Sequence, residues 1–375
     1  MLVPGLRHKA ELPAGLTPFL LGLLAIVGTV VAWAAFAARS TGSDFAALPF
    51  PLPDVTRIRS VAYFLPEDGG DTLYVRALDG GQTQSLATFP GTFTTHARGS
   101  ASPAGSSIAV LAVRGPAAYA RLTVFNLMTH TEREFTGSFD NLSPFAWSPD
   151  SERLAMTRSS SPPDAVGRVD TSIVETNVTT GTSVHVATFP GVLQAAPVGY
   201  SIDGERLFVV VVDQSGSWLW MEQSGQVKRL AMLSPGRTRD WRLSPDGARL
   251  AFIDITGGAE LSFAGRTLVV ATGVASPSTA RQDQIGVAWP PRSDVPAFGG
   301  PGGSLRLTAT QDPTAYVVPR EWSPDGTTLA ASVFSAAPGE ASSPQESVEL
   351  VTDTARERIT ERPGAQFIGW VLNGP

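Results

Sequence analysis

A four-residue turn, Ser-Pro-Asp-Gly, recurs along this chain, and each copy is followed by a short apolar run. Proline presets φ at the first central position of such a turn, aspartate accepts hydrogen bonds from backbone N–H groups two residues on, and glycine adopts a positive φ without strain. The motif therefore predicts a succession of short strands joined by tight hairpins. Clear copies begin at Ser148, Ser201, Ser244 and Ser323, and degenerate copies begin at Ser102 and Pro290.

The spacing of these copies indicates the fold class. Their first residues stand at 102, 148, 201, 244, 290 and 323, which gives steps of 46, 53, 43, 46 and 33 residues. Steps of roughly 40 to 50 residues filled with short strands are typical of the four-stranded blades of an all-β propeller. The aspartates are interpreted as turn residues, because no second carboxylate recurs beside them at a calcium-loop spacing. They are Asp150, Asp203, Asp246 and Asp325.

A second repeat marks the blade ends, since Leu-Ala-Thr-Phe-Pro-Gly at 86–91 is echoed by Val-Ala-Thr-Phe-Pro-Gly at 186–191. Two turns also carry a preceding tryptophan, at Trp147 and Trp322. With these features the chain resembles the TolB-like, WD40-like (PD40-type) β-propellers over residues 58 to 375. The resemblance implies the fold but no single function, because such propellers serve as scaffolds, sensors and enzyme side-domains.

The ends of the repeat array predict the blade number. Two strands near Val61 and Leu73 have no turn motif in front of them, and the last apolar run, 367–372, follows a Pro-Gly at the usual distance. We therefore expect the C-terminal run to complete the first blade, which removes an open sheet edge. This predicts seven blades. Six is the alternative, because the 33-residue step before Ser323 is short for a full blade.

An uncharged stretch precedes the propeller. The 21 residues from Pro18 to Ala38 are almost wholly apolar, and at ~1.5 Å per residue they span about 31 Å, enough for a bilayer core. Arg7 and Lys9 before the stretch weakly favour a cytoplasmic N-terminus. The alternative is a cleaved signal peptide ending at Ala37.

The expected organisation has four parts. They are a short cytoplasmic N-terminus at 1–16, one transmembrane helix at 17–38, a Pro-rich linker at 39–57 and the propeller at 58–375. This arrangement predicts a single-pass protein of a bacterial inner membrane, with its propeller in the periplasm.

Small residues at helical spacing form a stripe along the expected membrane helix. Such residues let neighbouring backbones approach, so the stripe predicts packing against the helices of partner subunits. The alternative is compositional bias, since 26 of the 28 basic residues are arginine, as in a GC-rich bacterial genome. The stripe consists of Ala25, Gly28, Ala32 and Ala35.

The search for chemistry gives no catalytic, cofactor or metal residue. The chain has no cysteine, and His96, His130 and His185 stand in no metal-ligand spacing. A Gly-x-Ser-x-Gly elbow is absent from the sequence. Beyond the expected anchor 26 basic residues face 33 acidic ones, a net charge of −7 that makes nucleic acid a poor partner. We therefore expect neither an enzyme nor a protein with a small-molecule substrate.

Two further features bear on binding. Trp218 and Trp220 alternate with apolar residues, which favours blade-to-blade packing over a sugar-stacking platform. Insertions rich in Ser, Pro and Gly at 159–169 and 336–345 could carry contacts or be plain solvated loops.

The sequence as a whole predicts a protein–protein interaction scaffold, an accessory or stabilising subunit of an inner-membrane complex. An energy-converting complex, respiratory or photosynthetic, is one conceivable host. The alternative is a periplasmic ligand-binding or sensor propeller that recognises a glycan or peptide.

Overall fold

The computed structural model divides the chain into two units, Met1–Leu48 and Pro49–Pro375. The structure describes residues 55–80, 82–90, 96–113, 120–140, 143–159, 164–257, 261–277, 283–301, 305, 315–335 and 346–372, all in the second unit. The expected membrane helix at 17–38, its stripe of small residues and most of the linker lie outside these ranges. Within them, no helix has the length and apolar character needed to cross a membrane.

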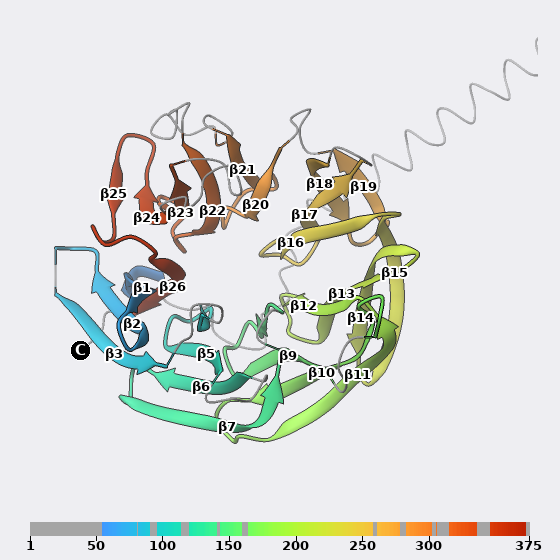
Figure 1. Ribbon diagram of the computed structural model, residues 1–375, viewed down its shortest axis with the longest axis horizontal. Helices are drawn as coiled ribbons and strands as arrows, with labels where there is room; N and C mark the ends of the chain where they lie inside the picture. Colours follow the sequence, from blue (N-terminus) through green and yellow to red (C-terminus); the bar gives the residue numbers. More distant parts are fainter. Residues whose placement is uncertain are drawn as a thin grey trace, which may run out of the picture. The chain divides into compact units, whose positions relative to one another are not determined.

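The described residues form six antiparallel sheets arranged in a ring (Figure 1), preceded by one short 3-10 turn, η1(Val55–Arg57). Sheet 1 has the order β26(Gln366–Leu372), β1(Ile58–Glu67), β2(Gly70–Ala77), β3(Thr83–Phe89). Sheet 2 consists of β4(Arg98–Ala101), β5(Ser107–Val113), β6(Ala120–Asn126) and β7(Thr131–Phe139). Sheet 3 consists of β8(Ala146–Trp147), β9(Arg153–Ser159), β10(Val169–Asn177) and β11(Ser183–Val192).

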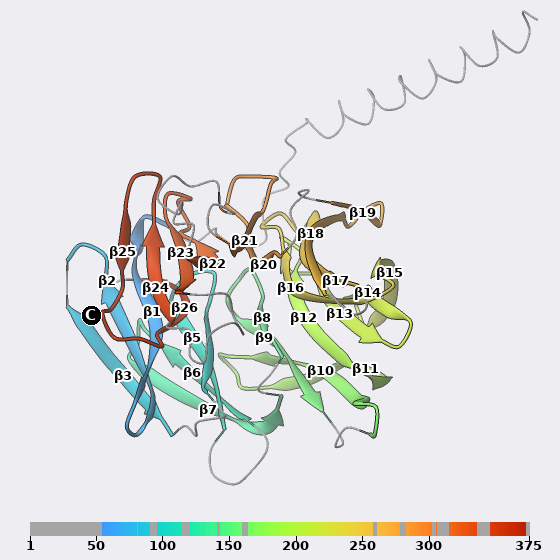
Figure 2. The ribbon, with the colours of Figure 1, turned by 45° about the horizontal axis from the view of Figure 1, so that its top comes forward.

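The other three sheets complete the ring, and Figure 2 shows the same circular order from a tilted view. Sheet 4 consists of β12(Gln194–Tyr200), β13(Arg206–Asp213), β14(Gly216–Gln223) and β15(Gln226–Ser234). Sheet 5 consists of β16(Arg237–Leu243), β17(Arg249–Thr256), β18(Ser262–Val269) and β19(Val274–Pro277). Sheet 6 has six strands, β20(Ile285–Ala288), β21(Ala297–Pro301), β22(Tyr316–Trp322), β23(Leu329–Phe334), β24(Glu346–Val351) and β25(Arg356–Arg358).

The repeated turn has the same hydrogen bonds in each clear copy. In the copy at 244–247, Asp246 Oδ1 accepts from the Ser244 hydroxyl at 2.5 Å and from the Ala248 N–H at 3.0 Å, while Ser244 Oγ accepts from the Arg249 N–H at 2.9 Å. The carboxylates of the other three turn aspartates make the corresponding contacts. All four carboxylates are thus engaged inside their own turns.

Apolar side chains fill the boundaries between neighbouring sheets. Leu73 of sheet 1, for example, packs in one cluster with Ile108 and Val110 of sheet 2, and all three are fully buried. Two repeat tryptophans add directional contacts across these boundaries. Trp147 Nε1 donates to the Ser100 carbonyl at 3.3 Å, and Trp289 Nε1 donates to the Arg242 carbonyl at 2.9 Å. Each of these indoles holds the first strand of the preceding sheet.

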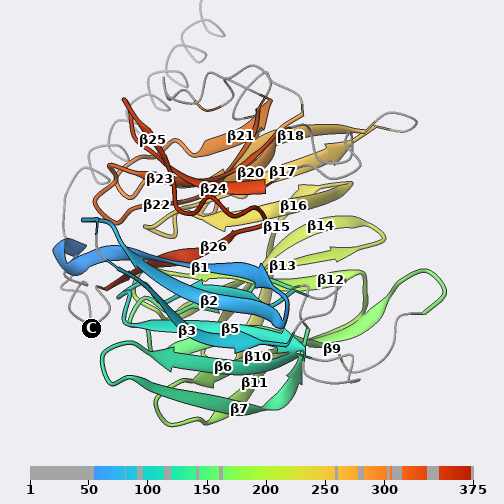
Figure 3. The same cartoon turned by 60° about the vertical axis from the view of Figure 1, so that its left-hand side comes forward.

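The ring is closed by the end of the chain. Strand β26 pairs antiparallel with β1, with partners that include Val61 and Trp370 (Figure 3). This pairing confirms the predicted closure. Trp370 is 3% exposed and Val371 is fully buried, so the last strand belongs to the core.

The prediction of seven blades is wrong, because the described residues form six sheets. The degenerate copy at Pro290 forms only the hairpin β20–β21, and this hairpin pairs with β22 through Gly300 and Val317. Gly299 of this hairpin lies very close to the backbone of β22. A Cβ on Gly299 would lie 2.5 Å from Pro319 Cδ and closer still to the Val317 carbonyl oxygen. Glycine at this position lets the hairpin extend the last sheet instead of forming a separate blade.

Candidate functional site

One position of the repeat lies two residues before the first residue of the turn, on the strand that leads into that turn. Strands β12, β16, β22 and β26 lie nearest the centre of the ring (Figure 1). Four copies carry a small residue at this position, Ser100, Ala146, Gly199 and Ala288. The copies that begin at Ser244 and Ser323 carry Arg242 and Glu321 instead, and both side chains are exposed. The repeat therefore places a cation and an acid at structurally equivalent positions of adjacent sheets.

Arg242 and Glu321 act on each other without forming an ion pair. Burial among protein atoms raises the pKa of Glu321 to about 7, and the charge of Arg242 opposes this rise. Burial lowers the pKa of Arg242, whereas the negative charges of Glu321 and Asp240 raise it by a smaller amount. Solvent reaches part of both side chains, but protein atoms surround them on most sides, and this surrounding protein causes both pKa shifts. Within the described chain, neither charged group has a hydrogen bond or an ion pair within 4.0 Å.

Two more arginines lie in the same region, Arg98 and Arg320, and Arg320 pairs there with Glu346 at 3.2 Å. Burial lowers the pKa of Arg98 on β4, the charge of Asp140 opposes this effect, and Arg320 on β22 adds to it. Arg320 also lowers the pKa of Arg242. Sheets 2 and 5 thus each contribute a guanidinium group within electrostatic range of Arg320 on sheet 6. We call Arg98, Arg242, Arg320 and Glu321 the axial cluster.

Irregular backbone positions the central pair. The pairing of β16 with β17 shifts register between Arg239 and Arg242, and Asp240 in this bulge has a φ of 54°. Its Oδ2 accepts from the Gly286 N–H at 2.9 Å, which ties the bulge to sheet 6. A second register shift lies between Pro319 and Glu321 on β22. Bulges commonly re-aim side chains beside functional sites, and here one immediately precedes each member of the pair.

The raised pKa of Glu321 predicts a stability that depends on pH. The folded carboxyl has a pKa of about 7 against an ordinary value of 4.5, so the folded state binds more protons between these pH values. The stabilisation is complete below about pH 4.5 and is lost as pH rises through about 7. Glu321→Gln should therefore be more stable than wild type at pH 8, by on the order of 1 kcal/mol because solvent screens the charge.

Urea unfolding at pH 5, 6, 7 and 8 checks this expectation. The Glu321→Gln curve should lose part of the decline that wild type shows above pH 5. Glu205→Gln, which removes an acid from an exposed turn, is the control. Parallel pH profiles for wild type and Glu321→Gln would contradict the assignment.

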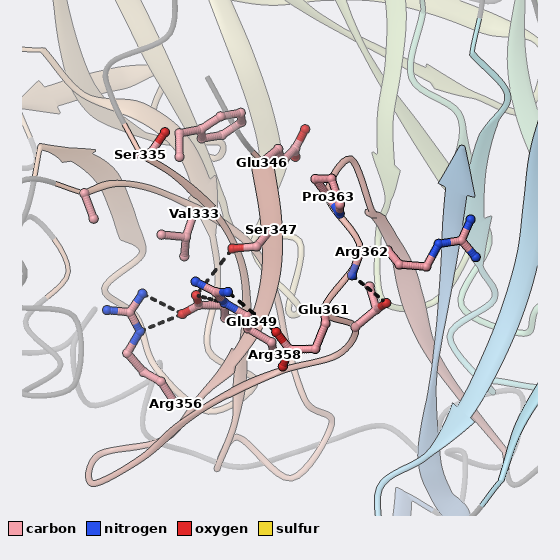
Figure 4. A pocket seen from close by; sticks show the side chains of 13 residues that line it. Val333, Ser335, Glu346, Ser347, Glu349, Arg356, Arg358, Glu361, Arg362 and Pro363 are labelled. Atoms are coloured by element: carbon pink, nitrogen blue, oxygen red, sulfur yellow. Dashed lines mark hydrogen bonds and ion pairs between the residues drawn. The ribbon is translucent and has the colours of Figure 1, made fainter. Parts of the chain in front are cut away.

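A polar cavity of about 370 Å³ lies beside strands β24 and β25 (Figure 4). Buried Glu349 accepts from Arg356 Nε at 2.6 Å and from Arg358 Nε at 3.5 Å. Figure 4 shows Arg356 and Arg358 converging on Glu349, whereas Arg362 points away toward sheet 1. There Arg362 pairs with Glu67 at 2.8 Å. Hydrogen bonds from Thr72, then Arg362 and Tyr74, lower the pKa of Glu67 to about 2. The Arg362–Glu67 pair thus joins the segment between β25 and β26 to sheet 1, whereas the pairs of Glu349 lie within sheet 6.

An apolar groove of about 340 Å³ separates sheets 3 and 4 and contains Val192, Val211 and Val227. At its wall the rings of Phe189 and Trp220 meet edge to face, with centroids 5.4 Å apart. Trp220 thus packs between sheets, as the sequence favours.

Two of the histidines named in the sequence have polar partners in the structure. His96 Nδ1 lies 3.1 Å from Asp71 Oδ1, and His185 Nε2 lies 2.7 Å from Thr188 Oγ1. No group of three or more potential metal ligands occurs among the described residues. Sequence reasoning missed Arg242 and Glu321. Aligning the copies on their turn serines would have shown charged residues where the other copies carry small ones.

Comparison with known structures confirms the TolB-type β-propeller fold. TolB from Acinetobacter baumannii is 15% identical, with a TM-score of 0.53 over 84% of this chain and 66% of that chain. An oligogalacturonate lyase in complex with manganese is 12% identical, with a TM-score of 0.56 over 79% and 86%. The propeller domain of the Trilobed protease from Pyrococcus furiosus, which has an open velcro topology, is 12% identical, with a TM-score of 0.54 over 81% and 95%. No protein-family model matches the sequence, and neither does any curated protein.

These likenesses correct one expectation. From the sequence we expected that the chain is not an enzyme, but the fold is shared with a lyase over 86% of that protein. The exclusion is therefore wrong, because the propeller fold occurs in enzymes as well as in other proteins. At such low identity the likeness shows the fold alone.

Proposed function

We propose that the protein is a membrane-anchored β-propeller that binds other proteins, as an accessory or stabilising subunit of a bacterial inner-membrane complex. The uncharged stretch at 18–38 and the basic residues before it support an anchor with a cytoplasmic N-terminus and a periplasmic propeller. The stripe Ala25, Gly28, Ala32 and Ala35 supports contact with partner helices. A respiratory or photosynthetic complex is one host within this proposal.

The axial cluster carries the proposal. Arg242 and Glu321 are exposed and have no hydrogen-bonding partner among the described residues. Arg320 already pairs with Glu346 at 3.2 Å, and the charge of Asp140 offsets that of Arg98, so Arg242 is the guanidinium group of this cluster that is open to a partner. Charge-assisted hydrogen bonds from arginine to a carboxylate are strong and directional. A partner that brings a carboxylate to Arg242 would therefore gain affinity and a defined orientation.

Co-purification from native membranes tests this function. The tagged full-length protein, extracted in mild detergent, should migrate with partner proteins, and Arg242→Gln should reduce their recovery at least tenfold. Arg237→Gln is the matched control, because Arg237 is an exposed residue of the same strand. Wild-type protein that migrates alone would contradict the interaction role. Equal recovery with both variants would contradict the part assigned to the axial cluster.

The polar cavity favours a second candidate function, a periplasmic sensor that binds a glycan or peptide. About 370 Å³ lined by charged and hydroxyl side chains suits a small polar ligand. Native mass spectrometry that finds a bound glycan or peptide, and no partner protein, would favour this function.

A further inference from the structure

The chemistry of the axial pair restricts what it can bind. A guanidinium group offers only donors, arranged in a fork that matches a carboxylate. The Glu321 carboxyl offers acceptor oxygens in either protonation state. A complementary ligand therefore carries a carboxylate and, close to it, an N–H or O–H donor.

Contacts between sheets 5 and 6 hold the pair in place. The Arg242 carbonyl accepts from Trp289 Nε1 at 2.9 Å, and Asp240 next to it accepts from the Gly286 N–H at 2.9 Å. Gly286 in turn lies against β22, since a Cβ there would meet Val318 Cγ1 at 2.5 Å. The backbones that carry Arg242 and Glu321 are thus linked through β20. The separation between the two charged groups exceeds 4.0 Å, which leaves each able to bond to a ligand.

The equivalent positions of other sheets favour a peptide over a sugar. They carry Ser100, Ala146 and Gly199, which are small and leave no aromatic face at these positions for a sugar ring to stack on. A peptide C-terminus needs no such face. Its carboxylate and its last backbone N–H lie on one residue, and both are present in any sequence.

We propose that the axial pair binds the free C-terminus of a partner polypeptide, with the carboxylate on the Arg242 guanidinium and the last backbone N–H donating to Glu321. This inference rests on the proposed function, since it names the part of the partner that the axial cluster recognises.

Titration of the purified full-length protein tests the proposal with two probes, N-acetyl-trialanine and its C-terminal amide. They differ only in the carboxylate. Isothermal titration calorimetry in low-salt buffer should show saturable binding of the acid and at least tenfold weaker binding of the amide. Arg242→Gln should weaken binding of the acid by a similar factor, while Arg237→Gln should leave it unchanged within twofold. Arg242→Lys, which keeps the charge but loses the fork, should fall between.

Equal binding of acid and amide, or no binding of either, would overturn the proposal on wild-type protein alone, whatever the variants do. The proposed function stays separately testable. A partner that co-purifies in an Arg242-dependent way, while acid and amide bind equally, would keep the scaffold role and reject C-terminal recognition.

Discussion

Removal of residues 366–375 is expected to abolish the cooperative unfolding of the propeller. The deletion takes away β26, in which Ile368 is 5% exposed, Trp370 3% and Val371 0%. Burial of each such side chain stabilises by about 1.5–3 kcal/mol, so the three together approach the whole stability of a typical domain, ~5–15 kcal/mol. The deletion also exposes the edge of β1, which favours aggregation.

Calorimetry and near-UV circular dichroism of the full-length protein in mild detergent measure this effect. A deletion of 373–375 alone is the control, because the pairing with β1 ends at Leu372. Trp370→Ala should give a graded result, a loss of about 3–5 kcal/mol. A truncated chain that melts like the full chain would show that β26 does not close the ring.

Gly299→Ala is expected to destabilise the protein by about 3 kcal/mol. The new methyl group would lie 2.5 Å from both the Ile285 carbonyl oxygen and Pro319 Cδ, so backbone would have to move. Overpacking of this kind typically costs about 1–3 kcal/mol, and the rigid neighbours place Gly299 at the upper end. Gly69→Ala is the matched control, because its Cβ would meet nothing within 4 Å. It should change stability by no more than about 0.5 kcal/mol.

Urea unfolding of the two variants gives the comparison. If Gly299→Ala and Gly69→Ala unfold at the same midpoint as wild type, the hairpin β20–β21 does not lie against β22 as closely as described, and the explanation for six sheets fails with it.

Features that depend on a few neighbouring residues could be predicted from the sequence. The Ser-Pro-Asp-Gly turns form through hydrogen bonds within six residues, so their spacing was enough to predict a propeller. The closing strand was also predictable, since the first sheet lacked a strand and the end of the chain supplied one.

Features that depend on contacts between residues far apart in the chain could not be predicted from the sequence. The number of sheets depends on the pairing of the hairpin β20–β21 with β22, where Gly299 lies close to Pro319, and nothing in the local pattern around 290 separates a short blade from a hairpin added to the next sheet. The axial pair could not be predicted either, because it forms only when the ring is folded. Arg242 and Glu321 lie 79 positions apart in the chain, and only the packing of sheet 5 on sheet 6 brings them within electrostatic range.

The pairing of β1 with β26 also sets the order in which the protein can mature. Strand β1 leaves the ribosome about 300 residues before its partner, which at roughly 5–20 residues per second means a delay of about 15–60 seconds. During that time the edge of β1 has no partner and can aggregate with other chains. A chaperone or the export machinery that holds the nascent chain would protect this edge. Slowing translation anywhere between β1 and β26 should therefore lower the yield of soluble protein, whereas slowing it before β1 should not.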